Sequence, residues 1–328
     1  MKIVLAPDSF KSSLTAAEVS AILKEKALKV FPDCHILEIP LADGDKGTID
    51  TLVSVLNGQY INVEANNYLG IPTSVKCGII HEDTFVIEAT ELLLDKGDSD
   101  ATLQSKLMLS SSYGVGQLIL SGLDKGFRKF YIGAGASMAN DGGMGCAQAL
   151  GVKFYNEIGK EIDGAGISLQ CISRIDDSSI DPRIQNSEIT VMCSVNNVLT
   201  GDEGTTFVYG AQNGGGPDEL LALEKGMRNY ARLLEVMKGL TICDVVYTGA
   251  CGGLPAALMA FCNAKLTSGI STILRLIHLE ELLEGASFVV VGEGKLDSTT
   301  IYGKAIMGIG TLCKAKGIPV VAIVGTIG

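Results

Sequence analysis

Short apolar runs alternate with amphipathic stretches over the first sixty residues. Residues 2–6 form a continuous apolar run, which predicts a strand buried on both faces. After Pro7, the segment Thr15-Ala16-Ala17-Glu18 has the pattern of a capping box, and apolar residues follow it at helical spacing until Pro32. A second apolar run at 36–41 and a second helical stripe at 49–56 come next. This β-α-β-α order predicts parallel strands joined by right-handed crossovers.

The middle of the chain has a different pattern, and the opening pattern returns near the end. Short runs at 61–63, 74–80 and 85–89 lie close together, which predicts hairpins. Further on, the spacing predicts strands at 130–132 and 189–195 and helices at 115–123 and 220–236. A strand at 288–291, a helix at 299–315 and a strand at 319–324 then repeat the opening order. We therefore predict one flavodoxin-like α/β parallel-sheet domain from residues 1–60 plus 286–328, with a second α/β domain, residues 61–285, inserted.

Composition and charge indicate which kinds of binding partner and which cellular compartment fit this chain. The 328 residues are 47% apolar and 19% charged, and the formal charge is 26 − 37 = −11, which argues against a broad nucleic-acid surface. An anionic small substrate is still compatible, because its site needs only a few local donors. Nine cysteines without a C-x-x-C pair predict buried free thiols in a cytoplasmic protein. The start lacks a signal-peptide pattern, and the longest apolar stretch is interrupted by glycines, so we expect no contact with a membrane.

Charged residues follow three of the predicted buried strands. In open parallel sheets, ligands bind outside the carboxyl ends of the strands. Lysines beside carboxylates at three such ends favour a phosphoryl-transfer or anion site, although turn and cap residues of the same types are the simpler explanation for any one loop. The residues are Asp8, Ser9 and Lys11 after the first strand, Asp43, Asp45, Lys46 and Thr48 after the second, and Glu293, Lys295 and Asp297 in the predicted exit loop of the strand at 288–291.

Two glycine-rich loops and the choice of general base complete the candidate chemistry. Residues 133–143 and 249–253 are able to present backbone N–H groups to phosphates, but neither matches a dinucleotide or P-loop fingerprint. Tight packing turns are the more common explanation for such loops. The three histidines share no ligand spacing, so a zinc or Ser-His hydrolase is excluded as the leading hypothesis. A general base must then be a carboxylate, with Asp8, Asp43, Asp141 and Asp297 as candidates.

The chain resembles the bacterial glycerate kinases of the glycerate 2-kinase type. The resemblance rests on blocks that occur in order over nearly the whole chain: residues 3–11 with Leu14-Thr15-Ala16, Ala42-Asp43-Gly44 with Gly47-Thr48, Gly133-x-Gly135-x-Ser137 with Asn140-Asp141-Gly142-Gly143, Phe207-x-Tyr209-Gly210-x-Gln212 with Gly214, Gly249-Ala250 with Gly252-Gly253-Leu254, and Gly292-Glu293-Gly294-x-Leu296-Asp297 with Gly303-Lys304. The resemblance implies ATP-dependent phosphorylation of D-glycerate to 2-phosphoglycerate, with Mg²⁺ on the nucleotide and the active site in the cleft between two domains. ATP and D-glycerate are thus the expected ligands, and a homodimer is one option for the assembly.

Roles for individual residues follow from combining the resemblance with the strand ends. We assign catalysis to Lys11, Asp43, Lys295 and Asp297, with the lysines holding the glycerate carboxylate or the moving phosphoryl group and the aspartates orienting or deprotonating the hydroxyl or holding Mg²⁺. Substrate binding is assigned to Asp8, Ser9, Thr48 and Glu293. Nucleotide binding is assigned to Gly135, Ser137, Asn140, Asp141, Gly142, Asn197, Gly252 and Gly253.

Several positions depart from the family's usual pattern. The family usually has Gly-Glu in place of Asp45-Lys46, Gly and Thr in place of Ala136 and Ala139, and Asp and Pro in place of Ser194 and Val198. Family members also continue through another strand and helix, which this sequence, ending at Gly328, is expected to lack. Two alternatives therefore stay open beside an active glycerate kinase: a catalytically impaired relative that binds glycerate or nucleotide, and a kinase for another small hydroxy acid.

Overall fold

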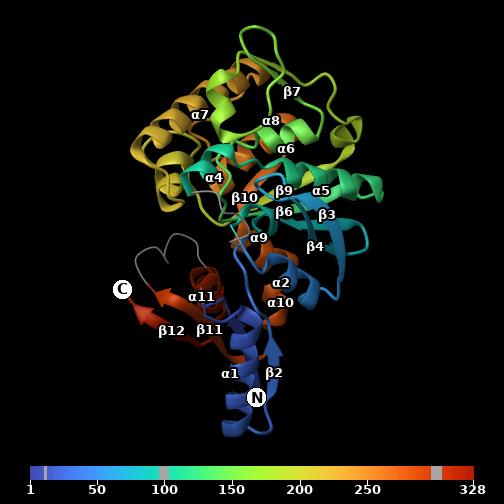
Figure 1. Cartoon of the computed structure of the whole chain (residues 1–328). Coiled ribbons are helices and arrows are strands. Elements are labelled where there is room, and N and C mark those ends of the chain that lie inside the picture. The colour runs from blue at the N-terminus through green and yellow to red at the C-terminus, as the bar shows by residue number, and fades with distance from the viewer. Residues whose placement is uncertain (11–12, 96–102, 297–304) are drawn as a thin grey trace.

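Two sheets that contain parallel strands organise the chain. The computed structural model describes residues 1–10, 13–95, 103–296 and 305–328. Figure 1 shows the four-stranded sheet in the lower part of the molecule and the six-stranded sheet above it. The mixed α/β fold class is as predicted.

The four-stranded sheet is built from both ends of the chain. Its order is β12-β11-β1-β2, and every neighbouring pair is parallel. The strands are β1 (Lys2–Pro7), β2 (His35–Glu38), β11 (Ala286–Leu296) and β12 (Val320–Ile327). The crossover helices are α1 (Ala16–Val30) and α11 (Ala305–Lys316). The predicted capping box is present, because the Glu18 N–H donates to Thr15 Oγ1 at 3.2 Å and the Thr15 N–H donates to Glu18 Oε2 at 2.8 Å.

The six-stranded sheet comes from the middle of the chain and has the order β10-β9-β6-β5-β4-β3. Its strands are β3 (Gln59–Asn66), β4 (Pro72–Ile80), β5 (Thr84–Glu88), β6 (Lys129–Ala134), β9 (Glu188–Cys193) and β10 (Lys265–Ser268). The pairs β3–β4 and β4–β5 are antiparallel, which confirms the predicted hairpins, whereas β5, β6, β9 and β10 are parallel. A small hairpin of β7 (Lys153–Tyr155) and β8 (Arg174–Asp176) lies apart from both sheets.

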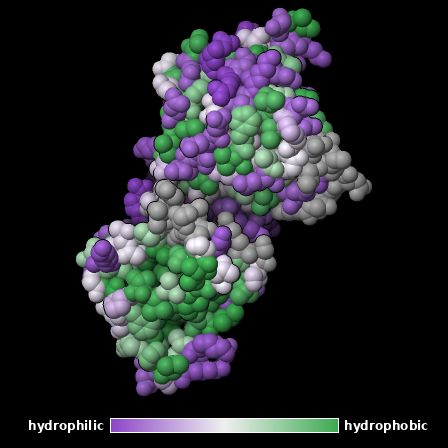
Figure 2. Space-filling model, turned by 90° about the vertical axis from the view of Figure 1, so that its left-hand side faces the viewer, coloured by the Kyte–Doolittle hydropathy of each residue, from purple (hydrophilic) through white to green (hydrophobic). Residues whose placement is uncertain are grey.

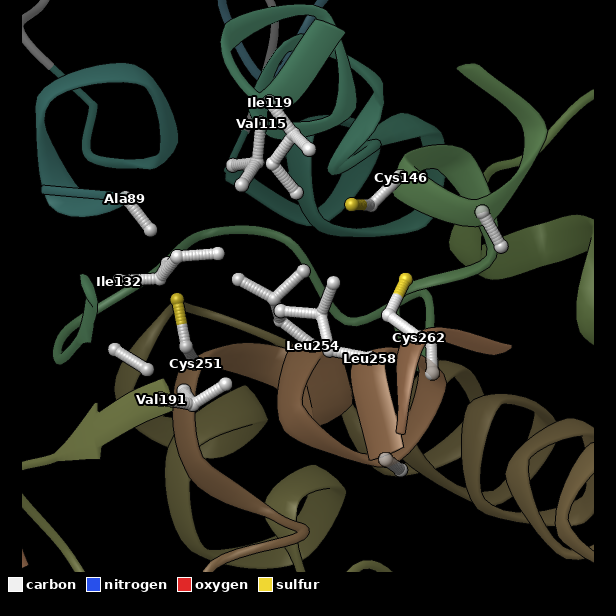
Figure 3. Close-up of a cluster of buried hydrophobic side chains, with 14 of the residues drawn as sticks. Ala89, Val115, Ile119, Ile132, Cys146, Val191, Cys251, Leu254, Leu258 and Cys262 are labelled. Carbon is white, nitrogen blue, oxygen red and sulfur yellow. The ribbon is translucent and has the colours of Figure 1, made fainter. Parts of the chain in front are cut away.

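Helices cover both faces of the six-stranded sheet. The helices are α2 (Thr48–Val55), α3 (Thr90–Leu93), α4 (Leu103–Leu109), α5 (Tyr113–Asp124), α6 (Met144–Ala149), α7 (Pro217–Lys238), α8 (Leu254–Cys262), α9 (Gly269–Leu276) and α10 (Leu279–Leu282). Figure 3 shows apolar side chains of α5, α6 and α8 meeting Ile132 and Val191 of the sheet. This dry packing fixes the carboxyl ends of β6 and β9.

A second apolar cluster joins the two sheets. It contains Val4 and Val291 from the four-stranded sheet, Met192 from β9, and Ile49 and Ile270 from α2 and α9. Helix α2 also packs on β4 and β5, although it follows β2 in the chain. The two sheets therefore share buried side chains where their helices meet, and the division into domains at residues 60 and 285 stays a prediction.

The structure corrects one expectation about the last strands. Residues 292–296 were predicted to form an exit loop, but β11 continues to Leu296 because β12 runs beside it, with Lys295 opposite Thr326 and Leu296 opposite Ile327. Val321 and Ile323 of β12 are 48% and 41% exposed. Figure 2 shows hydrophobic residues gathered on the surface of the lower part of the molecule, which holds the four-stranded sheet.

The cysteines carry free thiols throughout the chain. All nine thiols are free, and six are buried, as in Cys77, where burial raises the pKa to about 12. Cys171 is the exposed one. Among the described residues, the helices are too short or too polar to cross a membrane.

Candidate active site at the carboxyl ends of the two sheets

The segment from Leu41 to Gly47 connects the carboxyl ends of both sheets. On the side of the four-stranded sheet, the Leu41 N–H donates to the Pro7 carbonyl at 2.8 Å, and the Asp8 N–H donates to the Gly292 carbonyl at 2.9 Å. These bonds bring the ends of β1 and β2 next to the β11 segment that carries Glu293. Asp8, Asp43 and Glu293 thus lie on neighbouring segments.

The same segment touches the six-stranded sheet so closely that glycine is required. A Cβ atom at Gly44 (φ +101°) would lie 2.5 Å from the Met192 carbonyl oxygen at the end of β9. A Cβ atom at Gly269 would lie 1.9 Å from the Asp43 carbonyl oxygen, and one at Gly133 would lie 2.8 Å from the Gly44 carbonyl oxygen. The backbone of residues 43–44 is therefore fixed between β6, β9 and α9.

Glu88 is a residue at this edge that the sequence did not reveal. It ends β5, is 4% exposed, and accepts hydrogen bonds from the Gly47 N–H at 3.1 Å and the Ile49 N–H at 3.2 Å. Burial raises its pKa to about 7, although these N–H groups favour the charged form and the nearby Asp45 and Glu91 oppose it. Glu88 thus fastens the start of α2, and with it the loop that carries Asp43.

Thr48 and Asp45 secure the same loop from within. Thr48 is fully buried and its hydroxyl donates to the Asp45 carbonyl at 2.6 Å. The Asp45 carboxylate accepts from the Thr90 hydroxyl at 2.8 Å and from the Ala136 N–H at 3.2 Å. Thr48 therefore holds the turn in this structure, and its contact with substrate stays a prediction.

The two glycine-rich loops pack directly against each other. The Gly142 N–H donates to the Gly252 carbonyl at 2.9 Å, and a Cβ atom at Gly252 (φ +69°) would lie 1.7 Å from the Ala139 carbonyl oxygen. A Cβ atom at Gly253 (φ +91°) would lie 2.7 Å from the Gly142 Cα. Close backbone packing thus accounts for Gly142, Gly252 and Gly253, and their part in nucleotide binding stays a prediction.

Asp141 is the buried anchor of the first loop. Its Oδ2 accepts from the Ser112 N–H at 2.7 Å, the Ser112 hydroxyl at 2.8 Å and the Gly145 N–H at 3.0 Å, and its Oδ1 accepts from the Gly143 N–H at 2.9 Å. Burial raises its pKa, and these four donors work in the opposite direction. The carboxylate thereby holds residues 141–145 at the start of α6.

A short helix with π-type hydrogen bonding, Thr206–Gly210, gathers the remaining predicted residues. Asn140 Nδ2 donates to Thr206 Oγ1 at 3.2 Å, and the Tyr209 hydroxyl donates to Asn197 Oδ1 at 2.5 Å. Just beyond it, Asn213 Nδ2 donates to the carbonyl of Ser137 at 2.7 Å. The π-type turns that occur in helices are frequent at functional sites. The segment 206–213 therefore holds the exits of β6 and β9 in fixed positions.

Some predicted catalytic residues lie outside these contacts. Lys11 and Asp297 fall outside the described residues. Lys295 lies on β11 beside β12, and Ser9 follows Asp8 directly, with its N–H donating to Asp8 Oδ1. Gly135 is buried against Asp45 at the end of β6. In the ranges that the structure covers, no group of three His, Cys, Asp or Glu residues is arranged to hold a metal ion.

Comparison with known proteins decides the family. The family model described as "Glycerate kinase family" matches residues 3–328. The chain belongs to the glycerate kinase family. It is accordingly a kinase, and the resemblance deduced from the sequence blocks is confirmed.

Similar family members cover almost the entire chain. The glycerate kinase of Bacillus subtilis (strain 168) is 37% identical over 100% of this chain and 85% of its own length. The glycerate 2-kinase of Escherichia coli (strain K12) is 35% identical over 100% of this chain and 86% of its own length. A crystal structure from Salmonella typhimurium LT2, provisionally assigned as glycerate kinase 2, has a TM-score of 0.88 and 37% identity, and covers 99% of this chain and 87% of that one.

Proposed function

We propose that this family member transfers a phosphoryl group from ATP to the 2-hydroxyl of D-glycerate, between the carboxyl ends of its two sheets. The observation that carries the proposal is the segment 41–47, which is hydrogen-bonded to the end of β1 and packed on the ends of β6 and β9. Ligands of parallel α/β sheets bind at such ends. Because the segment 41–47 touches the carboxyl ends of both sheets, one substrate can bind at the edge of each sheet, on either side of this segment.

Asp43 is the residue that this arrangement favours as the base. It is half-buried, its backbone is fixed by Gly44 and Gly269, and its Oδ1 accepts from the Asp45 N–H at 3.3 Å. Phosphoryl transfer depends on positioning and on charge neutralisation more than on covalent chemistry. We assign Asp43 to orient and deprotonate the attacking hydroxyl, with Asp8, Ser9 and Glu293 lining the glycerate side.

The residues of the second sheet are assigned to the nucleotide. Gly135 and Ser137 at the end of β6, with Asn197 after β9, lie where the nucleotide phosphates are proposed to bind. Asn140, Asp141, Gly142, Gly252 and Gly253 support that surface through the contacts described above. Lys11, Lys295 and Asp297 keep their assigned catalytic roles as proposals.

Mg²⁺ fits this edge by donor type. Mg²⁺ commonly binds through one or two carboxylates together with substrate phosphates and water, and a cage of three protein ligands is not needed. Among the described residues, the half-buried Asp43 carboxylate would hold it as an alternative to acting as the base, because a carboxylate bound to Mg²⁺ accepts a proton poorly. Bound Mg²⁺ supplies neutralisation of the phosphate charge.

A coupled assay of ADP release with Mg·ATP and D-glycerate tests the proposal, with the product identified by ³¹P nuclear magnetic resonance. We expect turnover and 2-phosphoglycerate. Binding of glycerate or ATP by calorimetry without turnover would instead establish a non-catalytic relative. Faster turnover of another hydroxy acid in a substrate panel would establish a different acceptor.

A further inference from the structure

Asp45 places a negative charge on the proposed nucleotide side of the site. Its Oδ1 accepts from the Thr90 hydroxyl at 2.8 Å and from the Ala136 N–H at 3.2 Å. Thr90 lies two residues after the end of β5, and Ala136 lies two residues after the end of β6. Thr90 is 2% exposed, whereas Ala136 is exposed to solvent. One side-chain oxygen is thus held by donors at the ends of two adjacent parallel strands.

The structure makes room for this carboxylate. A Cβ atom at Gly135 would lie 2.1 Å from Asp45 Oδ1, so the absence of a side chain at Gly135 lets the carboxylate approach the loop backbone. The position is also at the rim, because Asp45 is half-buried and the neighbouring Ala136 is exposed. A ligand approaching this edge from solvent would reach the same two donors.

The charge of Asp45 has only neutral donors in the described parts of the chain. A backbone N–H and a hydroxyl that converge on one oxygen are a typical arrangement for carboxylate or phosphate oxygens. The Ala136 N–H and the Thr90 hydroxyl bind the charged oxygen of Asp45 without a compensating cation. The carboxylate of Asp45 therefore has the contacts that an oxygen of an anionic ligand would have.

We propose that the Ala136 N–H and the Thr90 hydroxyl form an anion-binding position that Asp45 fills with its own carboxylate. The expected ligand class is an oxyanion, either a phosphate or a carboxylate, and Asp45 lowers its affinity by occupation and by repulsion. This inference deepens the proposed function. It rests on that function for one point only, namely that anionic substrates bind at this edge of the sheets. Asp45 is then a specificity-determining residue, because a ligand must displace it or bind beside it.

Titration with inorganic phosphate tests the position without any need for turnover. Calorimetry at low ionic strength should compare the wild type with Asp45→Ala, which frees both donors, and Asp45→Asn, which keeps an acceptor but removes the charge. We expect phosphate to bind about fivefold more tightly to Asp45→Asn, the gain expected from removing one charge near 4 Å in a water-like medium. We expect about tenfold tighter binding to Asp45→Ala, which also frees both donors. Glu64→Gln, at an exposed position on β3, controls for the change in net charge and should leave phosphate affinity unchanged.

A second variant ties the gain to the named donors. Thr90→Val in the Asp45→Ala background should remove most of the gain, because one of the two donors is then absent. The proposal is overturned if folded Asp45→Ala and Asp45→Asn bind phosphate no more tightly than the wild type, or if the gain survives Thr90→Val. Because binding is measured in the absence of ATP and glycerate, an inactive enzyme that still shows the gain would contradict the proposed function alone.

Discussion

Glu88 makes folding stability depend on pH in an unusual direction. Burial raises the pKa of Glu88 from 4.5 to about 7. The folded protein therefore holds this proton at pH values where the unfolded chain has already released it. By linkage, the contribution of Glu88 to the free energy of unfolding falls as the pH rises from 4.5 to about 7 and is constant above that range.

The size of the effect follows from the two pKa values. One pH unit corresponds to about 1.4 kcal/mol, so the gap between 4.5 and about 7 amounts to about 3 kcal/mol. Since the isoelectric point is near 4.8, measurements are best started at pH 5.5. About 2 kcal/mol of the change is expected between pH 5.5 and pH 8.

Urea unfolding of the wild type and Glu88→Gln measures this change. Circular dichroism is the suitable signal because the chain has no tryptophan. The Gln side chain has a similar shape but does not titrate, so the wild type should lose about 2 kcal/mol relative to it from pH 5.5 to pH 8. Glu64→Gln should show no such trend. A wild-type stability that stays parallel to Glu88→Gln, or rises relative to it, would refute the reasoning.

The remaining predictions concern catalysis, loop packing and the surface. Asp43→Ala should lower turnover by about 10²- to 10⁴-fold without a change in thermal unfolding, and an unaltered rate in the ADP-release assay would remove Asp43 from the site. Gly252→Ala should lower the free energy of unfolding in urea by well over 2 kcal/mol, because its Cβ would lie 1.7 Å from the Ala139 carbonyl oxygen. The control Gly239→Ala has a similar φ but nothing within 4 Å of the added Cβ, and it should cost about 1 kcal/mol. Equal losses in the two variants would contradict the packing argument. Ile323→Lys, on the exposed face of β12, should raise solubility with stability changed by less than about 0.5 kcal/mol, and a large loss would show that this face is covered.

Periodicity predicted the strands and the sheet built from both chain ends, but not the packing of α2 on β4 and β5. Continuous apolar runs predicted the buried parallel strands, and the repeat of the opening pattern predicted a sheet made from both chain ends, because such patterns depend on local spacing. The capping box at Thr15 was predictable for the same reason. The extension of β11 to Leu296 was not, because it arises from pairing with β12 and not from local propensity.

The site was predictable only where its residues follow strands or carry motifs. Asp8 directly follows β1, and Asp43 lies in the loop after β2, so position after a strand indicated both. Glu88 was missed because a single carboxylate at the end of an apolar run resembles any strand terminus, and its partners Gly47 and Ile49 lie about forty residues away in sequence. The sequence also left two explanations for Gly252, and only the distance to the facing loop shows that packing requires glycine there.

The most direct test of the shared edge is a crystal structure with D-glycerate and a non-hydrolysable ATP analogue bound. We predict glycerate beside Asp8 and Asp43, and nucleotide phosphates at the ends of β6 and β9, on opposite sides of the segment 41–47. Ligands bound away from that segment, for example near Asp83 and Lys129 at the opposite ends of β5 and β6, would contradict it.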